Sequence, residues 1–332
     1  MTRKPPDTCA AFPDLFGAAD GSAGLAPATL GRAAGRLLDC RAAILEGPAG
    51  DIGYQHSVLC QTGLPYRPTT ARVWQREQGA VALSIEAGRV RHPSRPVWID
   101  LPLPHGEKPR LVLIHLNSEA LKAGSPVIDA GDSMTAFVRS LGIDTNGRNL
   151  RTLKDQLARL AAATVRLAVS EAGRSVQINT RIVSAFDLWF PRDEHQRVLW
   201  PTTVRLSDEY FASLVRHAVP LDNRAVAALS GSALCLDIYA WLAQRLHRVP
   251  AGRPQTIPWA VLKEQFGVWY GRLDHFRTYF RAPLKAVLAV YPEARLDIGM
   301  AGLVLHHSPP PVLRRFVVGA SLKPKGAGKP CG

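Results

Sequence analysis

Two stretches of the sequence place basic side chains opposite an apolar stripe at helical spacing, a pattern that can bind nucleic acid. In the first, the apolar positions recur every three or four residues, at Leu150, Leu153, Leu157, Leu160 and Ala161. Its other sides carry Arg148, Asn149, Arg151, Thr152, Lys154 and Arg159. Because arginine can read guanine through two hydrogen bonds or hold a phosphate, the pattern predicts a helix in the major groove of DNA. A solvated charged face, to which Asp155 also belongs, is the alternative interpretation.

The second stretch repeats this arrangement over residues 272–287. Its apolar side carries Leu273, Phe276, Phe280, Leu284 and Val287, and its opposite side Arg272, His275, Thr278, Arg281 and Lys285. Pro283 lacks the N–H that a helix interior needs, so we expect it to kink or end the helix. The part of this helix that faces a groove would then be residues 272–282.

The elements around both stretches predict the same motif twice. Helices expected over 107–123, 134–141 and 148–164 precede a hairpin of strands 165–170 and 175–190, and Arg174 lies at its turn. Helices over 222–247, 259–266 and 272–290, the first of them with a break near Gly231 as an alternative, precede a hairpin of 295–298 and 303–306. Helix, helix, turn, helix, hairpin is the order of a winged helix. The predicted fold class is therefore α+β, with tandem winged-helix (helix-turn-helix) DNA-binding domains.

The predicted domain boundaries follow from this repeat. Residues 1–63 are expected to be an N-terminal segment, partly disordered with short helices, and 47–71 an irregular connection rich in Gly and Pro. The first winged-helix domain would span 64–206, with a β-hairpin at its start, and the second 207–312. Residues 313–332 hold five basic and no acidic residues and are expected to be a flexible tail.

Composition favours a polyanionic partner. The chain of 332 residues has a net charge of +14, and residues 64–332 carry 36 basic and 21 acidic side chains. A field of this sign attracts nucleic acid, although a GC-rich genome would also enrich arginine. No apolar run is long enough for a membrane span, no signal peptide is recognisable, and the five cysteines form no C-x-x-C pair, so we expect a cytoplasmic protein.

Catalytic chemistry finds little support in the sequence. There is no phosphate-binding loop of the ATPase kind, no H-E-x-x-H and no His-hydrophobic-His, so we expect no catalytic residues, no metal and no cofactor. Most of the seven tryptophans sit in apolar patterns typical of a core. Trp269, in a predicted turn, is the best candidate for stacking on a base.

Long strings of the sequence closely resemble the plasmid-encoded RepA replication initiator family. The similarity covers about residues 64–312, from LPYRPTTARVWQREQG (64–79) through FDLWFPRDEHQRVLWPTTVRLSDEYFASLVRHAVPLD (186–222) and IPWAVLKEQFG (257–267) to HHSPPPV (306–312). The family pattern has a polar residue where Pro283 stands.

This resemblance implies a replication initiator that acts in plasmid copy control. Such a protein would bind repeated sites in the double-stranded plasmid origin, promote its opening and recruit the host initiator and replicative helicase, with a possible homodimer. A transcriptional regulator with the same tandem fold remains the alternative. A nicking relaxase would need a histidine pair that the sequence lacks.

Overall fold

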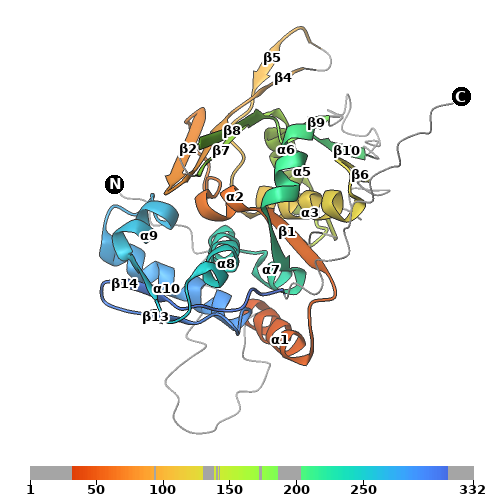
Figure 1. Ribbon diagram of the computed structural model, residues 1–332. Coiled ribbons are helices and arrows are strands. Elements are labelled where there is room, and N and C mark those ends of the chain that lie inside the picture. Colours follow the sequence, from red (N-terminus) through yellow and green to blue (C-terminus); the bar gives the residue numbers. More distant parts are fainter. Residues whose placement is uncertain are drawn as a thin grey trace, which may run out of the picture.

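The chain folds into helices interleaved with small antiparallel sheets. The computed structural model describes residues 32–92, 95–129, 138–139, 141, 143–171, 174–185 and 203–312. This mixed α/β architecture agrees with the predicted class at that level (Figure 1).

The first half of the fold is built on a four-stranded sheet with the strand order β2-β3-β7-β8. Strands β2 (Val73–Gln78) and β3 (Val81–Glu86) form one hairpin, and β7 (Thr164–Glu171) and β8 (Arg174–Thr180) form another. Between them the chain forms α3 (Glu107–Ala123), β6 (Val127–Asp129) and α5 (Gly147–Ala162). Strands β9 (Val183–Ala185) and β10 (Thr203–Leu206) join β6 in a smaller sheet, so the chain returns beside α3.

The second half has the same kinds of element around a smaller sheet. It comprises α6 (Asp208–His217), α7 (Asn223–Leu229), α8 (Ala233–Arg245), the 3-10 turn η2 (Leu246–Arg248), α9 (Trp259–Phe266) and α10 (Leu273–Ala289). The sheet has the order β12-β14-β13, from Gln255–Pro258, Gly302–Leu305 and Leu296–Ile298. The helix expected over 222–247, with a break near Gly231, is observed as α7 and α8. The break is confirmed, and Ser232 caps the start of α8 with its side chain.

Two segments join the halves where the sequence predicted an irregular connection. Strand β1 (Ile52–His56) pairs antiparallel with β11 (Ala218–Asp222), and α2 (Ser57–Thr62) follows at once. The prediction of irregular structure over 47–71 is therefore wrong for 52–62, because a partner strand far along the chain orders it. Before them, α1 (Arg32–Glu46) packs against α7 and α10.

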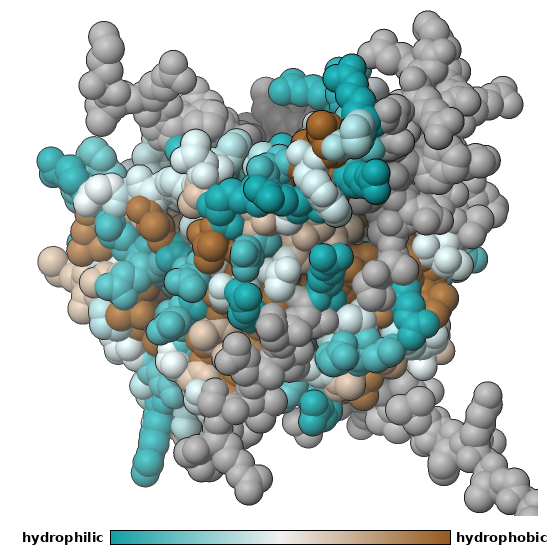
Figure 2. Space-filling model, turned by 90° about the horizontal axis from the view of Figure 1, so that it is seen from above, coloured by the Kyte–Doolittle hydropathy of each residue, from teal (hydrophilic) through white to brown (hydrophobic). Residues whose placement is uncertain are grey.

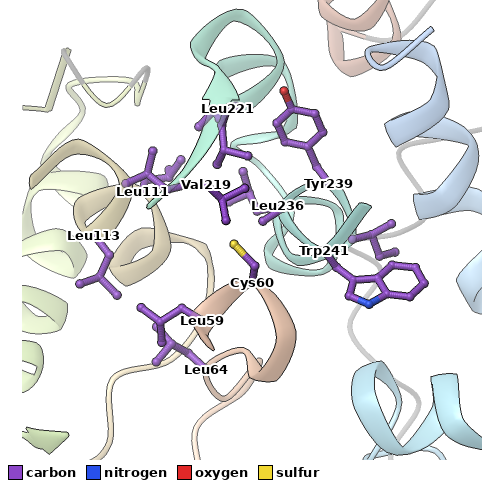
Figure 3. Close-up of a cluster of buried hydrophobic side chains, with 14 of the residues drawn as sticks. Leu59, Cys60, Leu64, Leu111, Leu113, Val219, Leu221, Leu236, Tyr239 and Trp241 are labelled. Carbon is purple, nitrogen blue, oxygen red and sulfur yellow. The ribbon is translucent and has the colours of Figure 1, made fainter. Parts of the chain in front are cut away.

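One hydrophobic core runs through both halves. Figure 3 shows side chains from α2, α3, β11 and α8 converging on it, among them Leu59, Cys60, Leu111, Val219, Leu236 and Trp241. A buried ion pair lies beside it, in which the Arg110 guanidinium on α3 donates to both carboxylate oxygens of Asp237 on α8 at 2.7 Å. The division into domains at 206 stays a prediction, and the described halves share buried side chains across that boundary.

A short hairpin stands apart from this core. Strands β4 (Arg89–Arg91) and β5 (Trp98–Asp100) pair only with each other among the described strands, and they extend away from the remaining elements at the top of Figure 1. Seen from that side, the surface is mostly hydrophilic with scattered hydrophobic residues (Figure 2).

Candidate nucleic-acid interface

Helix α5 is held in place at its start and along its inward side. The Asn146 side chain caps it by accepting the backbone N–H of Asn149 at 2.9 Å, and the Asn149 side chain donates to the Asp144 carbonyl at 3.0 Å. Leu153, Leu157 and Leu160 are buried as the stripe predicted. The outward side of the helix therefore has a fixed orientation.

Three of the predicted α5 residues form an exposed basic face. Arg148, Arg151 and Lys154 are exposed, and within the described ranges none of them has an ion-pair partner. The Thr152 hydroxyl is directed back to the Arg148 carbonyl at 2.9 Å. The face thus presents three cations, at intervals of three residues, that are free to bind phosphates or bases.

Arg159 occupies a different environment. Its side chain is only 15% exposed and forms an ion pair with Asp155 at 2.8 Å, while its Nη1 donates to His105 Nδ1 at 3.2 Å. Burial is the main cause that lowers the pKa of His105. Because a guanidinium can only donate, His105 Nδ1 is the acceptor in its contact with Arg159. Arg174 begins β8 opposite Glu171 at the end of the β7–β8 hairpin.

Helix α10 presents a second polar face. Its buried side carries Phe276, Phe280, Leu284 and Val287, whereas the predicted residues His275, Thr278, Arg281 and Lys285 are all exposed. Arg272 precedes the first turn and is bound to Asp274 at 2.7 Å, a hydrogen-bonded contact that raises the pKa of Arg272. The Thr278 hydroxyl donates to the Asp274 carbonyl at 3.1 Å.

The sequence analysis expected Pro283 to kink or end the helix, and the helix does not end there. Pro283 is itself buried inside α10, which continues to Ala289. Apolar residues on both sides of it, Phe280 and Leu284, are fully buried in the same core. Packing of the second half of the helix therefore outweighs the hydrogen bond that the proline cannot make.

An aromatic contact between the two halves was missed by the sequence analysis. The Trp269 ring, which is 41% exposed, stacks on Trp74 at 6.5 Å with an interplanar angle of 13°. The Arg76 guanidinium lies 4.5 Å from the Trp74 ring, and its Nη1 donates to the Glu264 carbonyl at 2.9 Å. One face of Trp269 is thus occupied by another indole. The alternation of Trp74 and Arg76 in the sequence indicates a shared strand face, but not this partner.

In the part of the chain that the structure describes, no group of three or more His, Cys, Asp or Glu side chains could hold a metal ion. No helix in that part is both long and apolar enough to cross a membrane.

Comparison with known proteins gives a match to a family model and solved structures that are similar in part. The crystal structure of selenomethionine derivatives of domains 2 and 3 of RctB has a TM-score of 0.47 and 10% identity, covering 76% of this chain and 99% of that one. A second crystal structure of RctB domains 2-3 has a TM-score of 0.43 and 9% identity, covering 72% and 83%. No curated protein matches the chain.

The family model for the plasmid-encoded RepA protein matches residues 103–261. This range begins just before α3, contains α5 and the β7–β8 hairpin, and ends within α9. Over residues 103–261, the chain is therefore similar to the plasmid-encoded RepA protein family.

Proposed function

We propose that this protein is a plasmid replication initiator that binds repeated sites in double-stranded origin DNA through α5 and α10. The observation that carries the proposal is the repeated placement of these helices. Each follows other helices and precedes a β-hairpin, β7–β8 or β13–β14, and each has an outward face that is polar and basic. A helix placed this way in a winged helix enters the major groove.

The second half supports the winged-helix assignment through its strand order. Strand β12 lies between α8 and α9, α10 follows, and β14 pairs with both β12 and β13. Helix, strand, two helices and a two-stranded wing is the order of that fold. In the first half α3, α5 and the β7–β8 hairpin supply corresponding parts, while the helix expected over 134–141 lies almost wholly outside the described residues.

Arg148, Arg151 and Lys154 would contact DNA in the first half, and His275, Thr278, Arg281 and Lys285 in the second. Exposed arginines at intervals of three residues lie about 4.5 Å apart along a helix axis, close enough for one groove to receive them together. Arg272 can bind a phosphate only if its ion pair with the Asp274 carboxylate breaks first. Phosphate contacts would give affinity, and the arginines that reach base edges would give specificity.

The protein would act by binding and not by catalysis. Origin opening would then draw on binding and on the deformation of DNA, since the sequence has no nucleotide-binding loop. We propose that the opened origin recruits the host initiator and replicative helicase in the cytoplasm, and that a homodimer is one of the protein's forms.

The experiment compares three variants in DNA binding and in plasmid maintenance. Arg151→Ala should weaken binding to the cognate repeat about 5- to 150-fold, the equivalent of ~1–3 kcal/mol, if Arg151 reads a base. Arg148→Ala should reduce the salt dependence of binding by about one counterion if Arg148 holds a phosphate. The control is Arg36→Ala, which removes the same charge from an exposed position on α1. It should leave the affinity for the repeat and its salt dependence unchanged.

Plasmid maintenance separates an initiator from a transcriptional regulator. A plasmid that carries only the origin and its repeats should persist when the protein is supplied, and should be lost with the double variant Arg148→Ala, Arg151→Ala. Tight binding to the repeats without any maintenance of the plasmid would contradict the initiator and favour the regulator. Unchanged repeat affinity in both single variants would exclude α5 from the groove.

A further inference from the structure

The β4–β5 hairpin separates its side chains between two faces. Its register pairs Arg89 with Asp100, Val90 with Ile99 and Arg91 with Trp98. Side chains directly opposite each other in an antiparallel pair point to the same face, and the faces alternate along each strand. Val90 is buried and Ile99 half-buried, so they hold one face against the protein. The other face presents Arg91 beside Trp98.

Trp98 is unusually exposed for a tryptophan. Its residue is 67% exposed, against 41% for Trp269 and 2% or less for Trp241 and Trp259. Within the described ranges Trp98 has neither an aromatic partner nor a guanidinium over its ring, whereas Trp74 has both. Val97 beside it is 48% exposed. A large flat apolar side chain left open to water on a projecting ribbon marks a binding surface.

The charge around Trp98 selects an anionic ligand. Arg91 and Arg95 are exposed, and neither has an ion-pair partner in the described part of the chain. The carboxylate of Asp100 is already bound by Arg89 at 2.6 Å and by Arg72 at 3.2 Å. The ribbon therefore offers a positively charged edge and one open aromatic face.

We propose that the β4–β5 hairpin, through Trp98 and Arg91, is a binding site for single-stranded DNA. An indole stacks on a base while a neighbouring arginine binds the phosphate, and this combination recognises unpaired strands with little sequence preference. In a duplex the faces of the bases are covered by their neighbours, and Trp98 would have to unstack a base step to reach one. An unpaired strand offers its base faces without that cost.

The root of the ribbon is fixed beside α5. Arg72 donates to the carbonyls of Ala87 at 2.8 Å and Leu101 at 3.2 Å, at the two ends of the hairpin. The backbone of Gly88 packs so closely on the carbonyl of Ala162, the last residue of α5, that any side chain at position 88 would collide with it. The ribbon and the basic face of α5 are therefore parts of one rigid unit. A strand held at Trp98 would lie next to DNA bound at α5, and only this last step rests on the proposed function.

The test measures binding of the purified full-length protein to a fluorescein-labelled 15-nucleotide oligothymidylate by anisotropy. Trp98→Ala should weaken this binding about 5- to 150-fold, the range expected for loss of one stacked base. Trp98→Phe, which keeps an aromatic face, should retain most of the affinity. Arg91→Ala should reduce the dependence of binding on salt by about 0.7 of a counterion. Leu45→Ala, which removes a 65% exposed apolar side chain from the end of α1, is the matched control and should have no effect.

Duplex binding measured in parallel distinguishes the outcomes. Trp98→Ala should bind the duplex repeat like the unaltered protein, whereas Arg151→Ala should bind the oligothymidylate normally. Unchanged oligothymidylate affinity in Trp98→Ala would overturn the inference. Equal losses on single strand and duplex would overturn it in favour of a wedge in duplex DNA. A lower sedimentation coefficient for Trp98→Ala than for the unaltered protein would overturn it, because Trp98 would then lie in an interface between two copies of the chain. Unchanged binding of the duplex repeat by both Arg148→Ala and Arg151→Ala, together with weaker oligothymidylate binding by Trp98→Ala, would reject the proposed role of α5 and leave the ribbon site standing.

Discussion

Replacement of Asp237 by asparagine should destabilise the whole fold, because it leaves the Arg110 charge buried without a counter-ion. The Arg110 side chain is 3% exposed and that of Asp237 10%. Burial alone would lower the pKa of Arg110, but the charge and hydrogen bonds of Asp237 outweigh it and raise that pKa. The guanidinium also donates to the carbonyls of Leu64 and Gly106, each at 2.6 Å, so it cannot swing out to water without breaking these bonds.

The expected loss of unfolding free energy is about 3 kcal/mol. Removing one partner of a buried ion pair costs ~3–5 kcal/mol. The lower end applies because asparagine keeps one acceptor in place and the backbone carbonyls still bind Arg110. For a domain of typical stability, ~5–15 kcal/mol, such a loss is a fifth or more of the total.

Urea unfolding at pH 7, followed by far-UV circular dichroism, measures this loss. The matched control is Glu86→Gln, which also turns a carboxylate into an amide, in an exposed pair with Arg166 at 3.4 Å. That change should cost less than ~1 kcal/mol. The double variant Arg110→Met, Asp237→Leu removes both charges and should recover more than half of the loss. A cost for Asp237→Asn no larger than that of the control would refute the reasoning.

Three further predictions concern local features. Burial lowers the pKa of His56 to about 3, below the ~6.5 of an unfolded histidine, so its contribution to stability is complete above pH 6.5 and falls as the pH drops toward 3. The free energy of unfolding measured in urea should therefore fall by about 2 kcal/mol between pH 7 and pH 5. The variant His56→Asn should not show this part of the pH dependence. Gly88→Ala should lower the thermal midpoint by several degrees, because its Cβ would collide with the Ala162 carbonyl, and an unchanged midpoint would contradict that contact. Trp269→Ala should cost about 1 kcal/mol and weaken the near-UV circular dichroism of its stack on Trp74, and an identical near-UV spectrum would count against the stack.

The sequence predicted those parts of the fold that depend on local spacing. The apolar stripe of 150–161 placed the buried leucines of α5, and the paired apolar strands placed the β7–β8 hairpin. In α10 the same reasoning was right for Phe276 and Phe280 but wrong for Leu273, which is 39% exposed because it begins the helix before the core is reached.

Long-range contacts account for the features that the sequence did not predict. The sequence analysis predicts irregular structure at strand β1 because Gly53 within it and the Gly and Pro residues around it mask the strand pattern, and its partner β11 lies in another part of the chain. The helix end considered at Pro283 did not allow for the packing of the residues that follow it.

The candidate site shows the same limit. Helical spacing correctly placed Arg148, Arg151 and Lys154 on an exposed face, but it also grouped Arg159 with them, and Asp155 and His105 bind that side chain. Spacing reports which side chains share a direction. It does not report which side chains from other elements contact them. The stack of Trp269 on Trp74 is another contact of this kind.

The pairing of β1 with β11 has a consequence for synthesis on the ribosome. His56 ends β1 and Ala218 begins β11, so the first strand leaves the ribosome long before its partner. At ~5–20 residues per second the delay is roughly 8 to 33 s. During that time β1 and the apolar side chains of α2 have no partner from the second half and are open to other nascent chains. Slower translation ahead of β11 would prolong this exposure and should lower the yield of native protein. A chaperone bound to the first 220 residues during the delay should raise that yield.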